Sequence, residues 1–154
     1  MKKSVALLLA ALCLLTALTG CGGSKKKTLE PRSFVDELMT QAKFTDSLNE
    51  LDAKVVPLLY GVDAADIKSA IVYAGTAATA EEIAVFEAVD DAAADRLLEA
   101  AKARVASQIE TYKSYGPAQA MTLENGTVAK TGSYVIVVIC TDTEGAKKVP
   151  DKYI

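Results

Sequence analysis

Six residues in the middle of the chain have the types and spacing of a small binding site. Arg104, Gln108, Thr111 and Tyr115 follow one another at steps of four, three and four, so on a helix they form one polar ridge, while Tyr112 lies beside them and Glu82 lies on the segment before that helix. A guanidinium offers two parallel donors to a carboxylate. Arg104 and Glu82 would therefore form an internal bridge or, if open to solvent, a ligand clamp. Tyr112 and Tyr115 would add flat contact surface for a peptide or a glycan.

The ridge also has a purely structural interpretation, in which Arg, Gln and Tyr side chains fix a helix to the edge of a sheet. The acidic residues Glu81, Glu82, Asp90 and Asp91 raise the alternative of paired acid/base or metal chemistry. Nothing in the sequence sets two of them at a defined separation, so capping or solvated roles are expected. The run from Asp142 to Glu144 lacks the repeated acidic spacing of a calcium loop. We therefore predict no catalytic residues, no metal site and no cofactor.

Histidine and cysteine usage narrows the chemistry further. The chain has no histidine, which removes the usual base for a Ser or Cys nucleophile and the commonest zinc ligand. Its three cysteines are Cys13, Cys21 and Cys140. Cys140 ends an apolar run that begins at Tyr134, and a buried cysteine behaves as a small hydrophobic residue. We expect Cys140 to be a buried core residue.

Cys21 follows a segment that is typical of an export signal. Lys2 and Lys3 precede an apolar stretch of about 14 residues, which is short for a membrane-spanning helix and fits a signal peptide. The stretch ends in Leu-Thr-Gly-Cys, which resembles the bacterial lipobox. That resemblance implies that residues 1–20 are a lipoprotein signal peptide and that Cys21 becomes a lipidated N-terminus. Two or more acyl chains would anchor the protein stably.

The residues after Cys21 indicate a tether followed by one domain. Residues 21–29 are rich in Gly, Ser and Lys, as a flexible linker should be, and residues 30–154 are long enough for one globular domain. The whole chain has a formal charge of -3, or about -5 without Lys2 and Lys3. Such a domain has no basic face for phosphates, so we expect no nucleic-acid partner. The membrane, through the lipid, is the partner that the sequence predicts.

The elements that must position the ridge follow from periodicity and turn signals. We predict a first helix over 30–44, a short helix or irregular segment over 47–60, and a hairpin of strands over 67–75 and 81–89. Asp90 or Asp91 should cap a long helix over 92–115, which Gly116-Pro117 ends. Its apolar stripe should comprise Leu98, Ala101, Val105, Ile109 and Tyr112. Residues 120–129 should then lead to a third strand, with the most apolar strand over 134–140.

These elements predict an α+β fold. An antiparallel sheet of about four strands should carry the long helix across one face. The strand over 134–140 is apolar on both sides, so it should be central and covered twice. The N-terminal helix is the natural second cover.

Several of these residues also carry a resemblance to a known family. The segment Ala80–Phe86, the pattern Arg-x3-Gln-x3-Tyr-x2-Tyr-x-Pro that starts at Arg104, and Gly132-Ser133-Tyr134-Val135 resemble the DUF4358 family of predicted lipoproteins, found mostly in clostridia and related Gram-positive bacteria. The resemblance extends over about residues 34–142. It implies a shared fold and the outer face of a single cytoplasmic membrane. It supplies no catalytic residues, because the family has no established activity.

Three functions fit these expectations. The first is a membrane-anchored, non-enzymatic binding or accessory module that meets an envelope protein, peptide or glycan outside the cell membrane. The second is a carboxylate-dependent envelope hydrolase, which requires two acidic groups about 5 to 9 Å apart. The third is a small-solute receptor of a transporter, a role that usually needs two lobes closing on a ligand.

Overall fold

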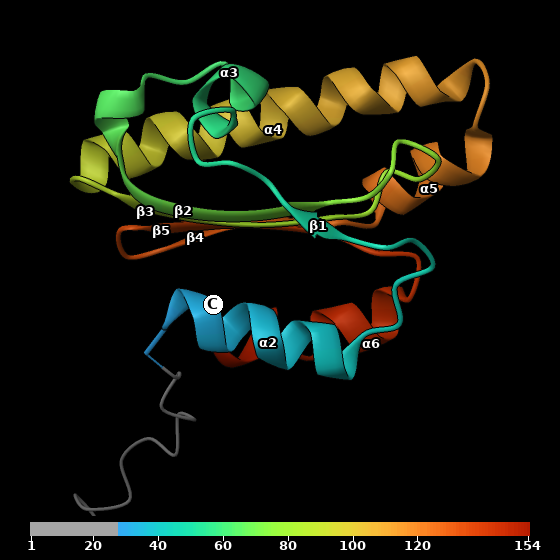
Figure 1. The fold of residues 1–154 in the computed structure, drawn as a ribbon, viewed down its shortest axis with the longest axis horizontal. Helices are drawn as coiled ribbons and strands as arrows, with labels where there is room; N and C mark the ends of the chain where they lie inside the picture. The colour runs from blue at the N-terminus through green and yellow to red at the C-terminus, as the bar shows by residue number, and fades with distance from the viewer. Residues whose placement is uncertain (1–27) are drawn as a thin grey trace, which may run out of the picture.

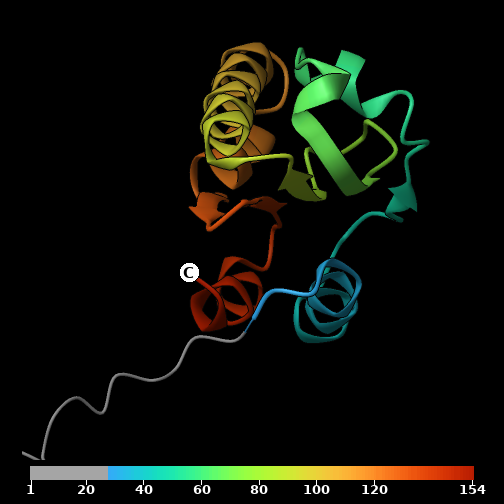
Figure 2. The same ribbon diagram turned by 90° about the vertical axis from the view of Figure 1, so that its left-hand side faces the viewer.

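The computed structural model describes residues 28–154 as a five-stranded sheet between two helical layers (Figures 1 and 2). The strands are β1 (Asn49–Glu50), β2 (Ile67–Ala74), β3 (Glu82–Ala88), β4 (Thr127–Thr131) and β5 (Tyr134–Ile139). The helices are α2 (Pro31–Gln41), α3 (Val56–Tyr60), α4 (Asp91–Lys113), α5 (Pro117–Glu124) and α6 (Thr143–Lys147), with 3-10 turns η2 (Ala64–Asp66) and η3 (Pro150–Lys152). The predicted α+β class is confirmed.

All neighbouring strands of the sheet are antiparallel, in the order β1-β2-β3-β5-β4. The predicted hairpin of β2 and β3 is present. So is the central position of β5, which pairs with β3 on one side and β4 on the other. The sheet has one strand more than expected, because two residues before α3 pair with the end of β2. Such a short edge strand leaves no periodic pattern in the sequence.

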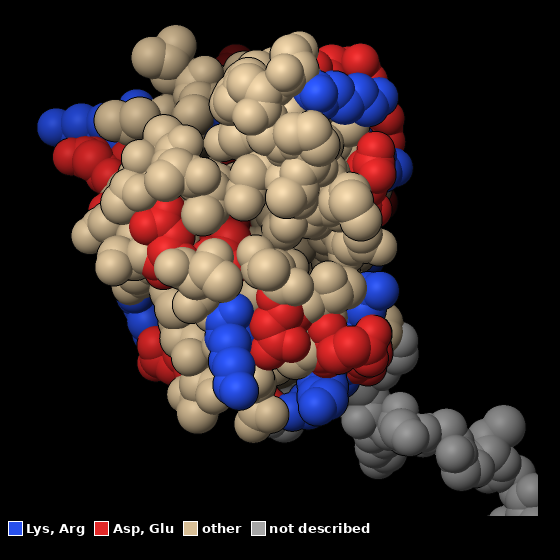
Figure 3. Space-filling model, turned by 90° about the vertical axis from the view of Figure 1, so that its right-hand side faces the viewer, with Lys and Arg blue, Asp and Glu red and all other residues tan. Residues whose placement is uncertain are grey.

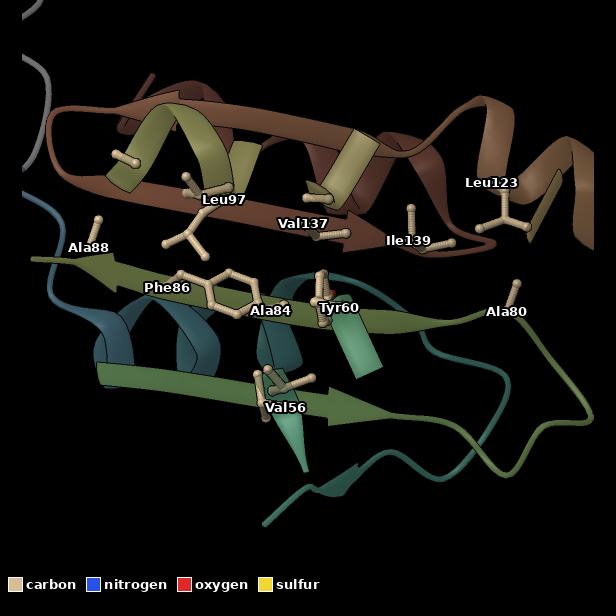
Figure 4. Packing of buried hydrophobic residues seen from close by; sticks show 14 of the residues in the cluster. Val56, Tyr60, Ala80, Ala84, Phe86, Ala88, Leu97, Leu123, Val137 and Ile139 are labelled. Carbon is tan, nitrogen blue, oxygen red and sulfur yellow. The ribbon is translucent and has the colours of Figure 1, made fainter. Parts of the chain in front are cut away.

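The two central strands are buried on both faces. On β5, Val135 and Val137 face the core beneath α3 and α4, whereas Ile136 and Val138 face the core above α2 and α6. Figure 4 shows the first of these cores, in which Phe86 of β3 lies among side chains from α3, α4 and β5. The double cover by α4 and the N-terminal helix is therefore as predicted.

Helix α4 packs through smaller residues than the sequence suggested. Asp90 caps it by accepting a bond of 2.7 Å from Ala93 N, as expected. Its buried face, however, comprises Ala93, Ala94, Leu97, Ala101 and Tyr112, whereas Leu98, Val105 and Ile109 are only partly buried. The predicted stripe therefore contacts the core, but it left out Ala93, Ala94 and Leu97, which are fully buried. Alanines bring the helix backbone close to the sheet, so the face that packs is set by small side chains rather than by the largest ones.

Two boundaries also differ from expectation. Residues 117–124 form helix α5, where the sequence analysis foresaw only a lead into a strand. Pro117 is the first residue of this new helix as well as the stop for α4. Leu29, which the sequence assigned to the tether, is buried in the core between the sheet and helices α2 and α6. The predicted signal peptide and most of the tether, with Cys21, lie outside the described residues.

Cys140 is buried as predicted, with 3% of its surface exposed. Its thiol donates to the carbonyl of Lys43 at 3.6 Å. Burial raises the pKa of Cys140 to about 11, so the thiol stays protonated and behaves as a core side chain.

Glu81, just before β3, joins three separate segments of the chain. Its side chain is buried and accepts from Thr45 N (2.8 Å), Thr45 Oγ1 (3.1 Å), Asp46 N (2.9 Å) and Thr141 N (3.0 Å). Burial acts to raise the pKa of Glu81, but the backbone donors outweigh burial and hold that pKa below its usual value. The ionised carboxylate therefore fixes the chain after α2 and the end of β5 to the start of β3.

We expect Glu81→Gln to lower the free energy of unfolding by about 2 to 3 kcal/mol at neutral pH, because an amide replaces an ionised acceptor of several hydrogen bonds. A group with a lowered folded pKa stabilises the fold above its unfolded pKa and loses that contribution as pH falls. The difference from wild type should therefore shrink below about pH 4.5. Urea unfolding at several pH values measures this difference in the free energy of unfolding. Glu124→Gln, at an exposed site, is the control, and an equal effect of both variants would contradict this role.

Candidate functional site

A buried ion pair connects the long helix to the central sheet. Arg104 Nη2 of α4 donates to Glu82 Oε2 of β3 at 2.6 Å, and the two side chains are 17% and 6% exposed. Tyr60, the last residue of α3, donates its hydroxyl to the other oxygen of Glu82. The guanidinium carbon lies 5.0 Å from the centre of the Tyr60 ring. The pair foreseen from sequence is present, and Tyr60 completes it as a three-residue network.

Electrostatics fix the protonation state of this network. Burial acts against the charge of Arg104, but the negative charge of Glu82 outweighs it and raises the pKa of Arg104. Burial, followed by the charge of Glu82, raises the pKa of Tyr60 well above its usual value. Arg104 is therefore charged and Tyr60 is a neutral donor across the physiological range. Arg104 Nε is buried without a hydrogen-bond partner, so the guanidinium is held mainly through its outer nitrogen and the Tyr60 ring.

A pocket of about 360 Å³ lies beside this network, between the segment that leads into α3 and helix α4. Leu51, Val55 and Leu59 line one side. Arg104, Gln108 and Tyr112 line the other, with Glu82 and the connection from β2 to β3 as the base. The volume is within the range of small-molecule and side-chain pockets. Most of the wall is aliphatic, and Arg104 and Glu82 in it already bond to each other.

The helix geometry explains which ridge residues reach the pocket. Arg104, Gln108 and Tyr112 are four residues apart and continue the line of Ala101 toward the end of α4. Tyr115 is 68% exposed and does not line the pocket, although its ring lies 5.1 Å from that of Tyr112. Thr111 is also exposed, and its hydroxyl bonds to Ser107 O on its own helix. The single ridge expected from sequence therefore divides into a pocket-lining row and an outer pair.

The loop between β2 and β3 is held in a fixed shape at the pocket. Asp46 accepts from Thr76 N (2.7 Å) and Thr79 Oγ1 (3.0 Å), and the bond from Thr76 N is the main reason that its pKa is lowered. Between them, Ala77 has a φ of 68°, a conformation that costs a non-glycine residue about 1 kcal/mol or more. Across the loop, Ala80 N donates to Gln119 of α5 at 2.8 Å. The pocket rim is thus preorganised.

The four acidic residues considered for catalysis are not brought together. Glu81 and Glu82 are neighbours on an extended segment, so their side chains point to opposite faces of the sheet. Each accepts hydrogen bonds from other residues. Asp90 caps α4, and Asp91 pairs with Lys130 at 2.7 Å. Within residues 28–154 no three His, Cys, Asp or Glu residues are arranged to hold a metal ion.

Sequence reasoning missed Tyr60 and the aliphatic side of the pocket. Leu48, Leu51 and Val55 have helical spacing but Pro57 interrupts it, so the sequence predicts only a short helix or an irregular segment over 47–60. In the structure Pro57 is the second residue of the short helix α3, and Gly61 ends the helix with a φ of 65°. A proline and a glycine four residues apart mark both ends of a one-turn helix, and that signal would have placed Tyr60 at its end.

A comparison of the chain with known protein families matches residues 41–140 to a domain of unknown function, DUF4358. The chain belongs to the DUF4358 family. The matched region of this DUF4358 protein contains all five strands, α3, α4, α5 and the pocket, and ends at Cys140. No curated protein and no solved structure matches the chain. None of the helices between residues 28 and 154 is both long and apolar enough to cross a bilayer.

We expect Arg104→Ala to lower the free energy of unfolding by about 3 to 5 kcal/mol, because it leaves Glu82 buried without its cation. Lys102→Ala removes an exposed pair with Glu99 on the same helix and should change stability by about 0.5 kcal/mol or less. Thermal and urea unfolding of both variants measure the difference. An Arg104→Ala protein as stable as wild type would contradict the structural role of the pair.

Proposed function

We propose that this protein is a lipid-anchored binding module on the outer face of the cell membrane, and that it acts without catalysis. The sequence around Cys21 supports the anchor, because a charged start, a short apolar run and a Leu-Thr-Gly-Cys ending occur in the order that bacterial lipoproteins use. The pocket beside Arg104 supports binding. The proposed binding role rests on this pocket.

The position of the pocket fits presentation away from a membrane. The described chain begins beneath the sheet, beside α2, whereas the pocket lies on the opposite face between α3 and α4 (Figure 2). From Cys21 to Thr28 the chain makes seven residue steps, which reach at most about 25 Å. A lipid on Cys21 would therefore keep the α2 and α6 layer near the bilayer. The pocket would open toward other components of the envelope.

The chemistry of the pocket favours binding over the two alternatives. A carboxylate-dependent hydrolase needs two acidic groups that face one substrate, but Glu81 and Glu82 point to opposite faces and are both engaged in hydrogen bonds. A transporter receptor usually closes two lobes around its solute, and residues 28–154 form one sheet with its covering helices. A preorganised pocket with compensated charges suits stable recognition.

The lipid anchor is tested by labelling cells that produce the protein with an alkyne fatty acid. We expect the wild-type protein and Cys13→Ser to carry the label and Cys21→Ser to lose it, because only the thiol of Cys21 would accept the lipid. Cys13→Ser is the matched control, since it changes a cysteine of the same apolar segment. The uncleaved signal of Cys21→Ser can itself hold the chain in the membrane, so labelling decides the question. Label on Cys21→Ser, or none on wild type, would contradict the anchor.

A further inference from the structure

We propose that the groove between α3 and α4 binds a linear, basic segment of a partner polypeptide and takes one apolar side chain into the pocket beside Arg104. This inference rests on the proposed binding role and specifies its ligand. It is carried by the length of the groove, by the small residues along it and by the charges that line it.

The pocket is one end of a longer groove along α4. A second hollow of about 400 Å³ shares Leu59, Arg104 and Gln108 with the pocket. A third hollow of about 420 Å³ shares Gly61 and Ala100 with the second. Because consecutive hollows have lining residues in common, they form one groove beside α4, next to α3 and η2.

The groove has the length of a short extended peptide. It follows α4 from Arg96, in the third hollow, to Tyr112, in the pocket. At 1.5 Å per residue this is about 24 Å, and an extended chain covers that distance with about seven residues. A small solute would use only one of the three hollows.

Small and polar side chains in the middle of the groove suit a peptide backbone. Ala100 and Ala103 of α4 leave room for main-chain atoms to approach the helix closely. Ser107 and Gln108 beside them offer a hydroxyl and an amide to main-chain groups. On the opposite side Leu58 is 85% exposed and Val55 is 48% exposed. Exposed apolar side chains beside an aliphatic pocket indicate contact with apolar side chains of a partner.

The charges of the groove favour a basic segment. The carboxylates in its lining are those of Asp63, Asp66 and Glu82, and Asp66 and Glu82 pair with the guanidinium groups of Arg96 and Arg104. The groove therefore has one carboxylate more than it has guanidinium groups. The described residues also have a formal charge of -8, because five of the 17 Lys and Arg residues precede Thr28 whereas all 20 Asp and Glu residues follow it. Positive side chains on a partner would be attracted to this surface before and after docking.

A glycan fits the groove less well. Carbohydrate recognition usually needs an open aromatic face and many polar groups. The Tyr60 ring is covered by Arg104 and packs edge-on against Phe86, and the Tyr112 ring packs against Tyr115. Figure 3 shows that the end of the molecule near α5 has a largely uncharged surface with charged side chains around it. The charged side chains at its margin are of both signs, so this end of the molecule adds apolar surface but no preference for a basic partner.

The test is a selection of linear octapeptides from a random phage-displayed library on the full-sequence protein purified in detergent. We expect enriched peptides to contain an apolar residue flanked by Lys or Arg. A fluorescent synthetic copy of the most enriched peptide is then measured against wild type, Ala103→Arg and Ala106→Arg. Both alanines are exposed on α4, but only Ala103 lines the groove. Ala103→Arg should weaken binding about tenfold or more, and Ala106→Arg about twofold or less.

The two variants carry the same added charge, so their difference separates docking in the groove from general attraction to an acidic protein. Equal affinities for them would overturn the inference. Enrichment of acidic or uncharged peptides that still depend on Ala103, or binding of chitotetraose that depends on Ala103, would also overturn it while leaving the binding role intact. If neither the library nor chitotetraose binds, the proposed function fails together with the inference.

Discussion

A charge held out of water is the constraint on which the site of this DUF4358 protein depends. Burying Arg104 and Glu82 removes the hydration of both, and their mutual attraction offsets that loss only when further hydrogen bonds complete the geometry. Tyr60 supplies one such bond and covers the guanidinium with its ring. The network forms only when three elements pack together. These are α3, which carries Tyr60, β3, which carries Glu82, and α4, which carries Arg104. The network thus joins α3, β3 and α4, and its residues Tyr60, Glu82 and Arg104 are among those that line the groove.

The second buried carboxylate plays the complementary role on the other face of the sheet. Glu81 collects backbone donors from the chain after α2 and from the end of β5. Two consecutive residues on an extended segment thus serve opposite layers, since their side chains must point in opposite directions. One joins helices to the sheet through an ion pair, and the other joins loops to it through amide hydrogen bonds. The rigid start of β3 that results also supports the loop that carries Ala77.

The sequence allowed the parts of the fold that depend on local pattern to be predicted. Strand β5, the hairpin, the Asp90 cap and the pairing of Arg104 with Glu82 all follow from periodicity, capping chemistry and charge. The buried face of α4 did not, because alanine carries little hydrophobic signal although its small size decides how closely helices pack. Pro57 and Gly61 signal the position of Tyr60 at the end of α3, but its contact with Glu82 could not be predicted, since the two residues are 22 apart in the sequence. The missing information is tertiary in each case.

The central claim, that the ion pair holds α4 to the sheet, is tested most directly by a double-mutant cycle. Arg104→Met, Glu82→Gln and the double variant keep most of the side-chain volume while removing one charge, the other or both. Urea unfolding of the four proteins gives the coupling free energy between the two residues. The account predicts a coupling of about 2 kcal/mol or more, with the double variant more stable than the sum of the single changes implies. A coupling within about 0.5 kcal/mol of zero would mean that the pair is incidental to the fold.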